Sequence, residues 1–176
     1  MRPASDLQKE YLEFIYRFVC EHGYQPNRGE LAENFGVYPR AVADTVGQLA
    51  KRGLVVLPEA TQERCLGLPH VRFRAVVTDR KAAAAAAAAS VADIVKVLVG
   101  HVERSGYQPT ITQIAAEVRA EPKTVIRRIT AGEAAGVFTP AASGRRRERA
   151  VAIANVRFEI VYDHSKTLAA MRSSGV

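Results

Sequence analysis

Apolar positions near the start of the chain follow the spacing of an amphipathic helix. They stand at i, i+3, i+4 and i+7 and are Tyr11, Phe14, Ile15 and Phe18. This spacing puts the side chains on one face of an α-helix. Ser5 and Gln8 precede them as a pair of capping residues, and Gly23 follows as a residue suited to end the helix. The pattern predicts a first helix from about Ser5 to Gly23.

Two shorter helical patterns follow. Asn27 and Glu30 have the spacing of a capping box and predict a second helix through Leu31 to Phe35. Pro39 is suited to the first position of a third helix, because that position needs no backbone N–H donor. The third helix would bury Val42, Val46 and Leu49. Gly53 is expected to end it.

Short extended segments complete this unit. Leu54–Leu57 and Arg64–Leu68 predict two strands of a hairpin, and Val71–Val77 predicts a third strand. Three helices followed by a hairpin are typical of a winged helix-turn-helix.

The same order of signals occurs a second time. At an offset of 83 residues, eight positions between Gly23 and Gly53 are identical in the second part of the chain; the first-part members are Gly23, Tyr24, Gln25, Pro26, Ala32, Pro39, Val42 and Gly53. Val71-Arg72-Phe73 recurs as Val156-Arg157-Phe158, at an offset of 85. An internal duplication explains identity, order and apolar periodicity together.

The second repeat predicts its own set of elements. Its first helix would be capped by Ser90 with Asp93, its second by Thr110 with Gln113, and its third would begin at Pro122. The predicted buried positions of the first and third helices are Ile94, Val97, Leu98, His101, Val125 and Ile129, and the predicted strands are Val137-Phe138, Arg149–Ile153 and Val156–Tyr162.

These patterns predict a mainly α fold with small β-wings, made of two tandem winged helix-turn-helix domains. The predicted division is residues 1–78 for the first domain, 79–89 for a linker and 90–176 for the second domain. The linker contains Ala82 to Ala89. Because alanine has the highest helix propensity, the linker is predicted to be helical.

Charge points to a polyanionic partner. The 176 residues carry a formal net charge of +7, of which +2 falls in residues 1–81 and +5 in residues 82–176. The two cysteines, Cys20 and Cys65, have no CxxC spacing, so no metal site is expected. No run of residues is long and apolar enough for a bilayer, and no signal peptide is visible. We therefore expect a cytoplasmic, nucleoid-associated protein that has no membrane partner and binds no cofactor.

The third helix of a helix-turn-helix lies in the major groove of DNA, so its exposed polar residues are candidates for contacts with bases. Asp44 weakens the first repeat as a reader, because a carboxylate repels phosphates. Four arginines lie on the tip of the second hairpin, where a phosphate backbone or minor groove would attract them. The candidate DNA-binding residues are Arg28, Arg40, Thr45, Gln48, Lys51, Arg52, Thr110, Lys123, Thr124, Arg127, Arg128, Arg145, Arg146, Arg147 and Arg149.

The segment from Leu12 to Leu68 resembles the DNA-binding domain of LexA-type repressors. The resemblance is carried by Gly-Tyr-Gln-Pro-Asn-Arg-Gly-Glu-Leu-Ala from Gly23, Pro39-Arg40-Ala41-Val42, Leu49 to Val55 and Arg64 to Leu68. It implies a winged helix that reads operator DNA through positions near Arg40 to Thr45 and their counterparts Lys123 to Arg128. LexA-type repressors carry a self-cleaving peptidase where this chain has its second repeat, so autoproteolysis is expected to be absent.

Together these features predict a sequence-specific protein for double-stranded DNA, in which two winged helices act as a covalent pseudo-dimer and regulate transcription. Two other interpretations stay open: a plasmid or phage replication initiator, and a protein-interaction module in which one winged helix docks on a partner. A homodimer is also open. The four histidines form no recognisable catalytic or metal motif, so no enzyme is expected.

Overall fold

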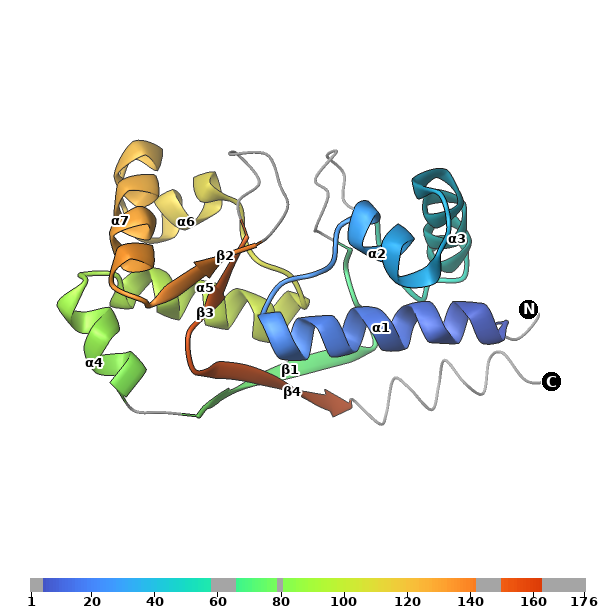
Figure 1. Cartoon of the computed structure of the whole chain (residues 1–176), viewed down its shortest axis with the longest axis horizontal. Helices are drawn as coiled ribbons and strands as arrows, with labels where there is room; N and C mark the ends of the chain where they lie inside the picture. The colour runs from blue at the N-terminus through green and yellow to red at the C-terminus, as the bar shows by residue number, and fades with distance from the viewer. Residues whose placement is uncertain (1–4, 58–65, 79–80, 142–149, 163–176) are drawn as a thin grey trace.

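The computed structural model describes residues 5–57, 66–78, 81–141 and 150–162. Its elements form two similar series, each with helices first and strands after them (Figure 1). In the first half the elements are α1 (Asp6–His22), α2 (Arg28–Phe35), α3 (Pro39–Lys51) and β1 (Val71–Val77). In the second half they are α4 (Lys81–Ala88), α5 (Ala92–Ser105), α6 (Ile111–Glu117), α7 (Pro122–Ala134), β2 (Phe138–Pro140), β3 (Val151–Ile153) and β4 (Val156–Tyr162). The prediction of a mainly helical fold with small β-sheets is confirmed.

The helices of the first half begin and end where their capping residues predict. Ser5 and Asn27 each form a complete capping box, and Pro39 occupies the first turn of α3. Gly23 ends α1 with a φ of 71°, a left-handed conformation that glycine adopts without strain. The predicted apolar stripe of α3 is buried, and it consists of Val42, Val46 and Leu49.

The second half follows the same rules with one exception. Thr110 caps α6 with a complete capping box, and Pro122 lies in the first turn of α7. The prediction that Ser90 caps α5 is wrong. Val91 holds that position, while Ser90 has a φ of 55° and its N–H donates to the carbonyl of Ala87. The tight turn out of α4 uses Ser90, so its side chain makes no cap.

Strands β1 and β4 have the predicted bounds, and they pair with each other. The pairing is antiparallel and runs from Val71 opposite Tyr162 to Val77 opposite Val156. At its centre, Arg74 lies opposite Glu159, and their side chains form an ion pair at 2.9 Å. These two residues occupy corresponding positions of the two halves. We call this two-stranded sheet the β1–β4 ribbon.

The predicted hairpins are short where the structure describes them. In the second half, β2 pairs with β3 in register from Phe138 opposite Ile153 to Pro140 opposite Val151. In the first half, a single antiparallel bridge joins Val56 to Gly67. Parts of the predicted hairpin strands, including Arg64 and Arg149, lie outside the described residues.

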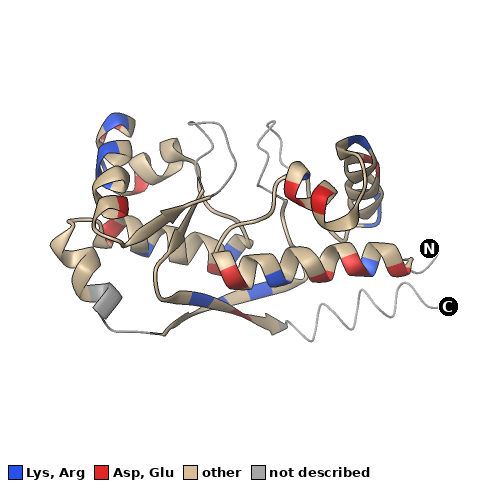
Figure 2. Ribbon diagram, viewed as in Figure 1, with Lys and Arg blue, Asp and Glu red and all other residues tan. Residues whose placement is uncertain are grey.

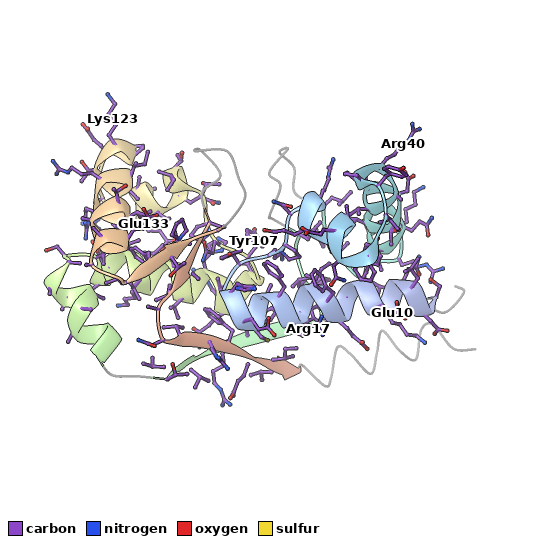
Figure 3. All side chains as sticks on the ribbon, viewed as in Figure 1. Glu10, Arg17, Arg40, Tyr107, Lys123 and Glu133 are labelled. Carbon is purple, nitrogen blue, oxygen red and sulfur yellow. The ribbon has the colours of Figure 1, made fainter. Side chains whose placement is uncertain are left out.

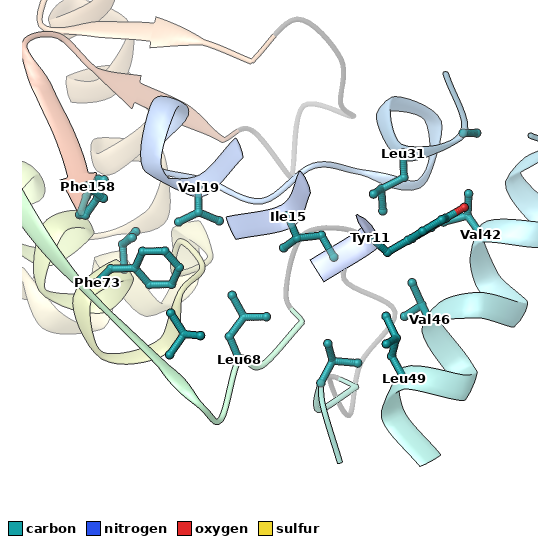
Figure 4. Close-up of a cluster of buried hydrophobic side chains, with 14 residues drawn as sticks. Tyr11, Ile15, Val19, Leu31, Val42, Val46, Leu49, Leu68, Phe73 and Phe158 are labelled. Carbon is teal, nitrogen blue, oxygen red and sulfur yellow. The ribbon is translucent and has the colours of Figure 1, made fainter. Parts of the chain in front are cut away.

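Each strand of the ribbon packs against the first helix of the other half: β4 lies against α1 and β1 against α5. The first of two buried apolar clusters therefore contains Tyr11, Ile15 and Val19 from α1 together with Phe158 from β4 (Figure 4). Val102 of α5 belongs to the same cluster. The core of the first half is completed by residues of the second.

The contacts between the halves are reciprocal. A Cβ atom on Gly23 would lie 2.8 Å from the ring of Phe158, and a Cβ atom on Gly106 would lie 2.9 Å from the ring of Phe73. Both distances are shorter than real Cβ contacts, so each glycine is needed where a phenylalanine of the opposite half passes. The two halves interlock as the subunits of a symmetric dimer do.

The second cluster fills its centre with different residues. Gly132 of α7 stands where α3 has the buried Leu49, and a Cβ there would lie 2.6 Å from the ring of Phe138. Phe138 in turn stands where the first half has Val55. A larger residue on the strand thus compensates for a smaller one on the helix, as close packing of a core requires.

The alanine-rich segment is helical, as predicted. It forms α4 and packs against α5, with Ala86 buried in the second cluster at 4% exposure. Within the described residues, no helix is both long and apolar enough to cross a membrane.

Candidate nucleic-acid interface

The two third helices lie at opposite ends of the molecule and on the same side of it. In Figure 1, α3 and α7 both lie above the level of α1 and α5, on the side away from the β1–β4 ribbon. Arg40 at the start of α3 and Lys123 at the start of α7 point outward on that side (Figure 3). The N-terminal turns of both helices are thus presented on one face, which we call the upper face.

Four predicted residues of the first half are exposed, and they are Arg28, Arg40, Gln48 and Lys51. Arg28 begins α2, and Arg40 lies in the first turn of α3. The Gln48 carbonyl oxygen Oε1 accepts a hydrogen bond of 3.0 Å from Gln8, which holds the side chain toward α1. Asp44 is exposed as well, so the helix surface carries charges of both signs (Figure 2).

Two other predicted residues of the first half are half-buried. The Thr45 hydroxyl donates to the carbonyl of Ala41 at 3.0 Å and is hydrogen-bonded to the side chain of Tyr11. Burial raises the pKa of Tyr11, and the hydrogen bond to Thr45 lowers it by a smaller amount. Arg52 is the half-buried C-cap of α3.

In the second half, Lys123 and Arg127 are exposed on α7, while Thr124 is half-buried. Thr110 is occupied as the N-cap of α6, because its hydroxyl oxygen accepts a hydrogen bond of 3.2 Å from the Gln113 N–H. Lys123 and Arg127 correspond in position to Arg40 and Asp44. The second half therefore has two cations where the first has a cation and an anion.

Arg128 is held inside its own half. Its guanidinium donates from Nε to the Ser90 carbonyl at 2.9 Å and from Nη2 to the same carbonyl and to the Asp93 carboxylate. The arginine side chain is 24% exposed. Burial raises the pKa of Asp93, but hydrogen bonds from Arg128 and the Ile94 N–H and the charge of Arg128 outweigh it, so that the pKa is lowered.

Thr45 and Arg128 occupy corresponding positions, and both face the first helix of their half. Each lies one position before a buried residue, Val46 or Ile129, and so borders the apolar stripe of its helix. A side chain at that border has partners within the protein. The four wing arginines Arg145, Arg146, Arg147 and Arg149 lie outside the described residues, and their part in DNA binding stays a prediction.

The described residues contain no group of three His, Cys, Asp or Glu side chains that could hold a metal ion. What the upper face offers is two long cationic side chains, Arg40 and Lys123, at the N-terminal turns of two helices, and Arg127 is exposed in the second turn of α7. Such groups suit phosphates and the acceptor edge of guanine.

The comparison with known families locates a DNA-binding domain in the first half. Residues 1–62 match the LexA DNA binding domain. The matched segment contains α1, α2 and α3, so the N-terminal part of the chain is a winged helix-turn-helix of this type. No peptidase domain is detected in the chain.

Curated LexA repressors are similar to part of the chain. The LexA repressor of Oleidesulfovibrio alaskensis is 32% identical over 72 residues, which cover 41% of this chain and 35% of that protein. The LexA repressor of Shewanella pealeana is 35% identical over 81 residues, covering 39% of each chain. The chain thus spans little more than a third of the length of these relatives. No solved structure matches it.

Exposure adds two candidates that the sequence pattern alone missed. Tyr38, the N-cap residue of α3, is 85% exposed, and Ile126 on α7 is 46% exposed. Both lie on a third helix or directly before it, beside the exposed cations of that helix. The position of Tyr38 directly before the proline of the third helix was the available signal, because that residue lies at the tip of the helix.

Proposed function

We propose that the protein binds double-stranded DNA at specific sequences and acts as a transcriptional repressor. The observation that carries this proposal is the match of residues 1–62 to the LexA DNA binding domain, with Arg40 exposed at the start of its third helix. Two relatives that match part of the chain are LexA repressors.

The second half is proposed to be a second winged helix-turn-helix. Its support is the order of helices α5, α6 and α7 followed by the β2–β3 hairpin, together with the sequence repeat and the shared capping residues. The two domains would arise by duplication and act as a pseudo-dimer within one chain. Since the two third helices differ, with Asp44 on α3 and Arg127 at the corresponding position of α7, the preferred site would have two unlike half-sites.

The proposed contacts follow from exposure on the upper face. Arg40 and Lys123 would enter the major groove first, because each lies in the first turn of its helix. Arg127 would contact a base or a nearby phosphate, and Tyr38 would contact the DNA beside Arg40. Arg28 and the wing arginines of the second half would bind phosphates. Thr45 and Arg128 are left out, since both have partners within their own half.

The proposal is tested by selecting bound duplexes from a random pool and measuring the affinity of the protein for the most strongly enriched duplex. Lys123→Ala and Arg127→Ala are each expected to weaken specific binding by about 1–3 kcal/mol. Arg157→Ala is the matched control, because Arg157 is an exposed arginine on the β1–β4 ribbon. A pool that yields no enriched sequence, or equal losses in all three variants, would overturn the proposal.

A further inference from the structure

We propose that Gln25 and Gln108 are positioning residues that fix the two halves relative to each other and thereby set the separation of the two DNA half-sites. This role rests on the proposed DNA binding. It concerns side chains that lie between the halves and touch no DNA.

Gln25 joins three backbone groups with one amide. Its Nε2 donates to the carbonyl of Leu66 at 2.6 Å and to the carbonyl of Gly106, in the other half, at 3.0 Å. Its Oε1 accepts from the Leu66 N–H at 2.8 Å. The residue is 0% exposed. The amide pairs with Leu66 as a neighbouring strand would, and its remaining N–H reaches the opposite half.

Gln108 repeats this arrangement in the opposite direction. Its Nε2 donates to the carbonyl of Val151 at 2.6 Å and to the carbonyl of Gly23 at 3.0 Å, and its Oε1 accepts from the Val151 N–H at 3.1 Å. Each glutamine therefore ties the second segment of its own half's hairpin, at Leu66 or Val151, to the C-terminal end of the other half's first helix. Two such joints, acting in opposite senses, oppose both sliding and rotation.

These hydrogen bonds add to the backbone pairing of the β1–β4 ribbon, which also joins the two halves, and to an apolar contact between them. Around them, Phe158 packs on Gly23 and Phe73 packs on Gly106. Apolar contact is non-directional and tolerates small shifts, whereas a hydrogen bond weakens steeply when its angle departs from linearity. A buried amide that loses a partner is also costly, so the native arrangement is strongly preferred.

Both glutamines lie close in sequence to the helices that are proposed to contact DNA. Gln25 precedes the N-cap of α2, Asn27, by two residues, and α2 packs on α3. Gln108 has the same relation to Thr110 and α6, which packs on α7. A shift at either joint would therefore move α3 relative to α7, and the accepted separation of half-sites would change.

The test uses duplexes that contain both selected half-sites with spacers lengthened one base pair at a time. Gln108→Met keeps the length of the side chain and removes the amide; Gln108→Asn keeps the amide and shortens its reach, in case the first variant does not fold. Gln8→Met is the control, because Gln8 is 3% exposed and its amide binds Gln48 within its own half.

Wild type should bind best at one spacing and lose at least about tenfold in affinity when roughly half a helical turn is inserted, since the second half-site then faces away. The Gln108 variants should reduce that loss to about threefold or less, whereas Gln8→Met should keep the wild-type profile. Folded Gln108 variants with the wild-type profile would overturn the proposal.

A distance measurement without DNA separates this role from the proposed function. Spin labels are placed on α2 and α6 by Glu33→Cys and Glu117→Cys, both exposed, in a background with Cys20→Ala and Cys65→Ala. One narrow distance distribution is expected, and Gln108→Met should broaden or shift it. If wild type binds no duplex, the proposed function fails; an unchanged distribution in a folded Gln108 variant would overturn the positioning role itself.

Discussion

Two neighbouring arginines on α7 give a sharp test of the interface. Arg127 is exposed, whereas Arg128 is paired with Asp93 and the carbonyl of Ser90. Arg127→Ala should therefore lower DNA affinity and leave stability nearly unchanged. Arg128→Ala should do the opposite, although both substitutions remove one positive charge from the same helix.

The magnitudes follow from the burial of each group. Hydrogen bonds to charged groups contribute about 1.5–3 kcal/mol when buried, whereas exposed ion pairs contribute about 0–1 kcal/mol. The Arg128 side chain is 24% exposed and that of Asp93 is 48% exposed. Solvent screening therefore places the cost of Arg128→Ala at about 1–2 kcal/mol. Arg127→Ala should change the free energy of unfolding by less than about 0.5 kcal/mol.

The ion pair also predicts how this cost depends on pH. Because the pKa of Asp93 is lowered in the folded protein, its stabilisation is present above the ordinary value of 3.8 and is lost as pH falls through the folded value. The difference in unfolding free energy between wild type and Arg128→Ala should thus be constant near neutral pH and shrink below about pH 4. Asp93→Asn should reproduce most of the loss at neutral pH.

Urea denaturation and fluorescence anisotropy with the selected duplex at fixed salt measure the two effects. Arg127→Ala should weaken binding by roughly 5- to 150-fold, and Arg128→Ala by less than about threefold. If Arg128→Ala lost as much affinity as Arg127→Ala while keeping full stability, Arg128 would contact DNA, and its assignment to the interior of the second half would be wrong.

Three further predictions concern the packing and the upper face. Gly132→Ala should destabilise the protein by about 1–3 kcal/mol in urea titrations, because the new Cβ meets the Phe138 ring, and Phe138→Val should restore part of the loss. Phe158→Ala should cost about 3–5 kcal/mol by the same measurement, since it opens a cavity between α1 and the ribbon; a loss under 1 kcal/mol would contradict the interlocked core. Tyr38→Ala should weaken binding to the selected duplex and leave stability within about 0.5 kcal/mol, because the side chain is 85% exposed; unchanged affinity would remove Tyr38 from the interface.

Local signals predicted the helices well, since their ends depend on residues a few positions apart. The capping boxes of Ser5, Asn27 and Thr110 and the prolines at the starts of α3 and α7 all act within one helical turn. Ser90 misled the prediction because the same Ser-x-x-Asp spacing occurs in a turn whose φ is positive.

These local signals did not predict which distant segments pair with each other. The bounds of β1 and β4 were visible from their apolar residues, but alternation within a strand does not identify the partner strand. Nor did it show that each strand would cover the first helix of the opposite half. The same limit applies to Arg128, which helix periodicity placed on the exposed face of α7 beside Arg127. Its side chain instead binds Asp93, 35 residues earlier in the chain, and the periodicity of one helix does not predict such a contact.

The exchange of strands between the halves has a consequence for biosynthesis. Residues of α1 leave the ribosome first, whereas Phe158, which covers them, is translated more than a hundred residues later. Helix α1 must therefore keep part of its apolar surface exposed, or bind a chaperone, until β4 has been synthesised. A fragment that stops before β4 would keep this surface bare and leave β1 without its partner, so it should be prone to aggregate or to pair with another copy of itself.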